Sequence, residues 1–104
     1  RGIISQPGMT RFCLDLGHKA VAAENPHPRV RFLDLPDAEA VMQSEEHLVL
    51  ETPEADKYSV GQTLHGIPRH VCPTAALYRE ACLVENRRIV ERWTIEARAR
   101  RLTV

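Results

Sequence analysis

Several features that mark other protein classes are scarce in this sequence. No apolar run approaches the ~18 residues of a membrane-spanning helix, and no charged-then-apolar targeting signal opens the chain. Aromatic residues make up only 5% of the 104 residues, which argues against a surface that stacks nucleic-acid bases. The net charge is zero, so the overall electrostatics favour neither nucleic acid nor an anionic membrane. We therefore expect no nucleic-acid partner and no membrane partner.

Cysteine is also scarce. The three cysteines, Cys13, Cys72 and Cys82, are an odd number at wide spacing. This argues against the disulfide framework of a secreted domain and favours a reducing compartment, so we expect a cytoplasmic protein. The chain begins at Arg1 rather than at a methionine, and we expect it to be a piece of a longer protein.

The remaining composition is that of one ordinary globular domain. Hydrophobic residues make up 43% and charged residues 27%, which is typical of such domains, and the length suits a single domain over residues 1–104. The charge is unevenly spread, since residues 34–56 carry eight acidic residues and no Lys or Arg. We interpret this as oppositely charged faces of one domain rather than a docking surface.

Hydrophobic alternation predicts mainly strands. Residues 10–16 place Phe12, Leu14 and Leu16 on one face of a half-buried strand. Further strands are expected at 29–35 and 45–51, a hairpin at 78–84 and 88–95, and short helices at 37–43 and 73–77. The fold class is therefore all-β in the main, as a small antiparallel β-barrel or sandwich with one or two short helices.

The segment at residues 68–74 carries the clearest chemistry. On a strand, His70 and Cys72 project from the same face, and imidazole with thiolate is a good ligand pair for zinc. Two ligands fall short of the four in a structural site, so water and substrate would complete an open site. On the local sequence alone, a buried cysteine beside a surface histidine remains the simpler interpretation.

Other polar residues are weaker candidates. His18, His47 and His65 could bind a metal, although a lone histidine more often has a structural role. On a strand, Glu45 shares a face with His47. Lys19 could bind an anion or be solvated.

Four segments, taken in order, resemble one known family. Residues 14–20 are similar to the family's Asp-Ala-Gly-x-Lys stretch, and residues 44–47 to its Glu-Glu-His stretch. Residues 70–74 are similar to its metal-binding stretch, and residues 90–98 to its final strand and tail. On these residues the chain resembles the C-terminal domain of the D-threonine aldolase and D-serine dehydratase family. These are pyridoxal-phosphate enzymes of the alanine-racemase fold type.

The resemblance implies a two-domain parent enzyme. Its N-terminal barrel would hold pyridoxal phosphate on a lysine, and its C-terminal β domain would lie across the cofactor. The residues matching His70 and Cys72 would hold zinc or another divalent metal that binds the substrate hydroxyl. The implied activity is that of a lyase, an aldolase, dehydratase or racemase-like enzyme acting on small D-3-hydroxy amino acids. The implied partners are the barrel domain and, for the full-length enzyme, a second copy in a homodimer.

The chain departs from this family in what it lacks. A barrel needs about 200 residues or more, and neither Lys19 nor Lys57, the only lysines, matches the cofactor lysine. We therefore expect the isolated domain to be inactive, with no catalytic residue of its own and no assigned cofactor-binding residue. A cysteine at position 72 is the dehydratase-like choice in this family, where aldolase-like members have an acid.

Two other functions stay open at this stage. The first is a non-enzymatic β-barrel module that binds nucleic acid through its arginine-rich end. The arginines of that end are Arg87, Arg88, Arg92, Arg98, Arg100 and Arg101. The second is a zinc-stabilised domain in which Cys82 and His65 would join His70 and Cys72.

Overall fold

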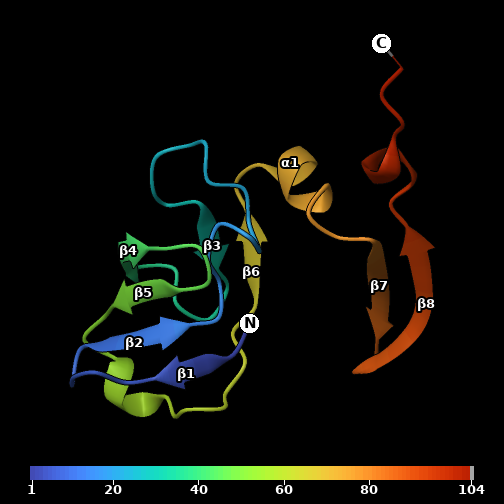
Figure 1. Cartoon of the computed structure of the whole chain (residues 1–104). Helices are drawn as coiled ribbons and strands as arrows, with labels where there is room; N and C mark the ends of the chain where they lie inside the picture. The colour runs from blue at the N-terminus through green and yellow to red at the C-terminus, as the bar shows by residue number, and fades with distance from the viewer. Residues whose placement is uncertain (104) are drawn as a thin grey trace.

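The computed structural model describes residues 1–103. Short strands account for most of the regular structure (Figure 1). The helical elements are η1 (Ala55–Lys57), α1 (Val71–Ala75) and η2 (Glu96–Ala99), of which η1 and η2 are single 3₁₀ turns. The strands are β1 (Ile3–Ser5), β2 (Arg11–Leu14), β3 (Val30–Phe32), β4 (Glu39–Gln43), β5 (Leu48–Glu51), β6 (Gly66–Pro68), β7 (Glu80–Glu85) and β8 (Arg88–Thr94).

All strand pairs are antiparallel, which confirms the mainly all-β prediction. The largest sheet has the order β1-β2-β5-β4, and β3–β6 and β7–β8 form separate two-stranded sheets. Within residues 1–103 the three sheets do not join into a closed barrel.

The core lies between the four-stranded sheet and the β3–β6 pair. Phe12 and Leu14 are completely buried, as the alternation predicted, and Leu16 is 6% exposed. Phe12 is paired with Leu50 on β5, and Leu14 with Leu48. Each such buried side chain stabilises the fold by about 1.5–3 kcal/mol, so the β2–β5 pair is the centre of the domain.

Two sequence-based predictions of local structure were wrong. Residues 37–43, predicted as a helix, contain β4, because pairing with β5 overrides a weak local helix preference. Residues 70–72, predicted as a strand that Pro73 ends, lie at the start of α1, because β6 ends its pairing at Pro68. The short helix predicted at 73–77 overlaps α1. Pro73 is tolerated there since the first N–H groups of a helix have no partner within it.

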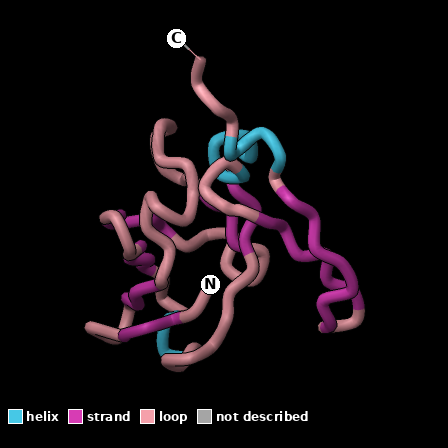
Figure 2. The backbone as a smooth tube through the Cα atoms, turned by 45° about the vertical axis from the view of Figure 1, so that its right-hand side comes forward, coloured by secondary structure: helices cyan, strands magenta, loops and turns pink. Residues whose placement is uncertain are grey.

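The predicted hairpin is confirmed as β7–β8. Its turn residues Asn86 and Arg87 both have positive φ, 50° and 63°, as in the tight turn that suits a hairpin. Both views show the hairpin projecting from the rest of the molecule (Figures 1 and 2), and its strands are exposed except at Leu83. The radius of gyration is accordingly 15.2 Å, against about 13 Å for a compact domain of this size.

A close backbone contact at Gly17 sets the path of the chain after β2. A Cβ atom at this position would lie 2.0 Å from the carbonyl oxygen of Glu45. The next two residues continue the contact, because His18 N donates to Ser44 O at 3.0 Å and Lys19 N to Glu45 O at 3.1 Å. Residues 17–19 therefore lie directly along the turn between β4 and β5.

We expect Gly17→Ala to lower the free energy of unfolding by about 3 kcal/mol, because the added methyl group must push two backbone segments apart. Gly8→Ala is the matched control, since nothing lies within 4 Å of a Cβ placed there; it should change stability by less than about 1 kcal/mol. Urea unfolding of the three proteins measures both values. Equal, small effects of the two substitutions would contradict the close packing at Gly17.

Candidate functional site

The segment formed by residues 17–24, which we call the linking loop, connects three of the stretches singled out in the sequence. Its first residues lie along Ser44 and Glu45, as described above. Further on, Ala22 N donates a hydrogen bond to Thr74 Oγ1 at 3.0 Å, and Ala20 O accepts one from the Tyr78 hydroxyl at 2.6 Å. The linking loop therefore holds both the β4–β5 turn and α1.

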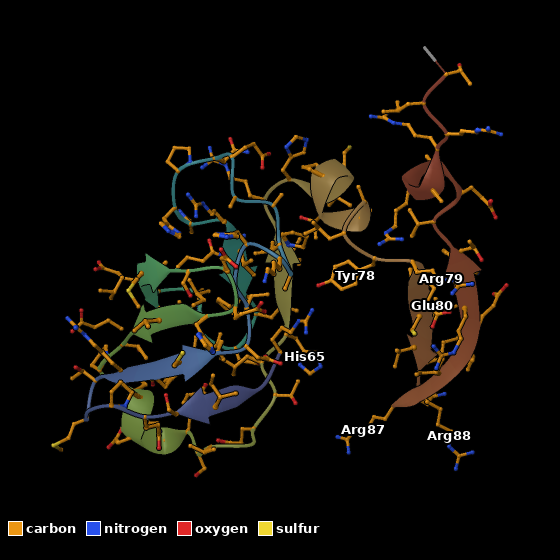
Figure 3. The ribbon with its side chains drawn as sticks, viewed as in Figure 1. His65, Tyr78, Arg79, Glu80, Arg87 and Arg88 are labelled. Atoms are coloured by element: carbon orange, nitrogen blue, oxygen red, sulfur yellow. The ribbon has the colours of Figure 1, made fainter. Side chains whose placement is uncertain are left out.

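Tyr78 attaches the chain that leaves α1 to the body of the domain. Its side chain points back from this segment toward the body (Figure 3). Besides donating to Ala20, its hydroxyl accepts a hydrogen bond from Arg1 Nη2 at 2.5 Å. The hairpin thus begins from a fixed point, although it extends away from the core.

His70 lies at the start of α1, where its backbone is extended (φ −123°, ψ 104°). Its carbonyl oxygen accepts a hydrogen bond from the Thr74 hydroxyl at 2.8 Å. Its ring Nδ1 contacts Glu24 Oε1 at the end of the linking loop. The contact with His70 is the main reason that the pKa of Glu24 lies below its ordinary value, and it leaves Nε2 as the second, unengaged ring nitrogen.

Cys72 is the second residue of α1 and has an exposed thiol. The strand argument for a face shared with His70 was wrong, because this segment is helical. His70 is instead the residue before the helix and Cys72 is its second residue, and residues two apart in a helix do not face each other. Both lie at the surface of the domain. The donors present, an imidazole nitrogen and a thiol, are of the kind that zinc prefers, and both are open to solvent and to further ligands.

The β4–β5 turn holds Lys19. Residues 45–47 are not in a strand, so the face predicted to be shared by Glu45 and His47 does not exist. Instead, Lys19 Nζ lies 2.7 Å from Glu46 Oε1 and 3.1 Å from Glu45 Oε2. These two hydrogen bonds, with Glu46 the stronger cause, raise the pKa of Lys19.

The structure does not bring the remaining metal candidates together. Within residues 1–103, no three His, Cys, Asp or Glu side chains are grouped as a metal site. His65 lies before β6 (Figure 3), whereas His70 follows that strand, and Cys82 lies on β7 of the hairpin. A four-ligand structural zinc site is therefore not assembled by the described part of the chain.

Glu24 is the site residue that the sequence did not reveal. It stands in a proline-rich loop and is 46 residues away from His70, so no spacing rule connects the two. The hydrogen bond between Ala22 N and Thr74 Oγ1 likewise joins residues far apart in the sequence, and no sequence pattern predicts it.

A comparison with protein families identifies the family of this chain. Residues 2–84 match the family described as "Putative serine dehydratase domain". The chain belongs to this family. The match covers the linking loop, the β4–β5 turn and α1, and it ends within β7.

Members and structures similar to this serine dehydratase domain come from several bacteria. Uncharacterized proteins of Mycobacterium bovis and Mycobacterium tuberculosis are 32% identical over 97 residues, which is 89% of this chain and 73% of theirs. The crystal structure of D-threonine aldolase from Filomicrobium marinum matches 93% of this chain with a TM-score of 0.81 at 23% identity. That likeness shows a shared fold. The domain spans only 26% of the aldolase chain.

One further property follows from the described residues. None of the helical segments in residues 1–103 has the length and apolar character needed to cross a membrane.

We expect pyridoxal phosphate followed by borohydride to label Lys19 only to the low level of Lys57, because both are exposed ammonium groups paired with carboxylates and a Schiff base needs the neutral amine. Peptide mass spectrometry measures the labelling. The double variant Glu45→Gln/Glu46→Gln removes the carboxylates and should increase labelling of Lys19. Stoichiometric labelling of Lys19 in the unmodified chain would contradict the inactive state that we expect of this domain.

Proposed function

We propose that this chain is the C-terminal domain of a pyridoxal-phosphate-dependent enzyme that acts on small D-3-hydroxy amino acids by aldol cleavage, dehydration or racemisation. Membership in the serine dehydratase domain family supports the enzyme class. In this proposal the domain contributes a divalent-metal site through His70 and Cys72. What supports it is the resemblance of residues 70–74 to the family's metal-binding stretch, together with the exposure of both His70 and Cys72 at the surface.

The domain would work together with a barrel domain that carries the cofactor lysine. The similar aldolase chain, of which this chain covers 26%, is long enough to hold such a domain. Both lysines described here are paired with carboxylates, Lys19 as above and Lys57 with Glu54 at 2.7 Å, and so are poorly suited to bind the cofactor. The exposed hairpin would supply surface for contact with the barrel or with a second copy in a homodimer.

His70 and Cys72 would hold the metal, and water and substrate would complete its shell. When bound, pyridoxal phosphate supplies an electron sink and a divalent metal supplies Lewis acidity toward a substrate hydroxyl. The chain's own residues then serve two purposes. His70 and Cys72 provide the donor atoms, and the contacts of Glu24 and Thr74 fix where His70 lies.

The choice of zinc rests on the donor atoms. A thiolate with an imidazole suits zinc better than magnesium or calcium, which prefer oxygen ligands. An open shell with two protein donors also suits a metal that must exchange water for substrate.

We expect the chain to bind one zinc ion, and Cys72→Ala to weaken that binding by about 100-fold or more. Loss of an outer-shell partner alone costs about 10–100-fold, and loss of a ligand costs at least as much. Cys82→Ala is the matched control, since Cys82 is also an exposed free thiol, and it should leave the affinity nearly unchanged. Competition with a chromophoric chelator measures all three affinities.

Equal losses in the two cysteine variants would contradict the assignment of Cys72. Absence of zinc binding by the unmodified chain would contradict the proposed metal site as a whole.

A further inference from the structure

His70 and Glu24 form a contact between two distant parts of the chain. His70 Nδ1 meets Glu24 Oε1, and both side chains are about half-exposed. At that exposure an ion pair contributes little to stability, about 0–1 kcal/mol. The contact is therefore better suited to orient the ring than to hold the fold together.

Glu24 is itself held in place by a chain of hydrogen bonds that reaches the core sheet. Its Oε1 accepts from Asn25 Nδ2 at 2.9 Å, and Asn25 O accepts from Arg29 Nε at 2.7 Å. Arg29 Nη1 then donates to Gln43 Oε1 at 2.7 Å, and Gln43 Nε2 donates to Leu16 O at 3.1 Å. The carboxylate is thus connected to β4 and to Leu16, the residue before the linking loop.

The backbone of His70 is fixed independently of Glu24. Arg69 N donates to Arg29 O at 2.8 Å, and the Thr74 hydroxyl donates to His70 O at 2.8 Å. The same hydroxyl accepts from Ala22 N at 3.0 Å. Because both backbone segments are fixed from different directions, the fold brings Glu24 within reach of the His70 ring.

This contact decides which ring nitrogen is free. A carboxylate oxygen of ionised Glu24 can only accept a hydrogen bond, so Nδ1 of a neutral His70 carries the proton. The lone pair is then on Nε2, and the tautomer is set by the hydrogen bond at the other nitrogen.

We propose that Glu24 is a positioning residue for His70, which fixes the imidazole with Nδ1 protonated and presents Nε2 to the metal. The part of this proposal that concerns the metal rests on the function proposed above. The part that concerns the tautomer does not, because it is a property of the metal-free chain.

Two measurements on the 104-residue chain test the proposal. Long-range ¹H–¹⁵N spectra of the metal-free protein, with neutral His70, report the tautomer. Chelator competition reports the zinc affinity. We expect the unmodified chain to show the Nδ1–H form. Glu24→Ala should lose that preference and bind zinc about 10–100-fold more weakly. Glu24→Gln, which keeps an acceptor oxygen, should retain the tautomer and most of the affinity.

Glu39→Ala is the control, since Glu39 is an exposed carboxylate on β4, and it should change neither readout. An Nε2–H tautomer in the unmodified chain would overturn the proposal whatever its zinc affinity. So would a zinc affinity that is equal in the unmodified chain and in Glu24→Ala. If the chain binds no zinc, the proposed metal site fails, and the proposed role of Glu24 toward the metal fails with it. The tautomer then still decides whether Glu24 orients the ring.

Discussion

Gly17 lies against the backbone of Glu45, and the arrangement of the rest of the site depends on this contact. A side chain there would keep the two segments apart and move the linking loop away from the β4–β5 turn. The same loop, a few residues later, holds Thr74 and Tyr78 through its backbone. Together with the backbone hydrogen bond from Arg69 N to Arg29 O, this close approach places the start of α1, and with it His70 and Cys72, relative to the core.

The two parts of the domain differ in how much apolar surface they bury. The sheet around Phe12 and Leu50 buries a core, whereas the β7–β8 hairpin leaves Ile89 and Trp93 more than half exposed. An isolated two-stranded hairpin is at best marginally stable. This contrast is what we would expect of a domain that completes its packing against another part of a larger enzyme.

The sequence predicted the elements whose signals are local. Strict alternation identified the strand that contains Phe12, and a turn between two strand-like runs identified the hairpin. It failed at residues 37–43, where pairing with β5 decides the structure, and at residues 70–72, where α1 begins two residues before Pro73. His70 and Cys72 were found by residue type and resemblance. Glu24 was not found, because no local sequence pattern predicts a contact between residues that are 46 positions apart.

The proposed metal site at the start of α1 would be open and would take one imidazole and one thiolate from this chain. X-ray absorption at the zinc edge, on the chain loaded with one equivalent of zinc, tests it most directly. The account predicts one sulfur at about 2.3 Å, one imidazole nitrogen, and oxygen donors from solvent. A shell without sulfur, or one with two sulfurs that recruits Cys82, would contradict it.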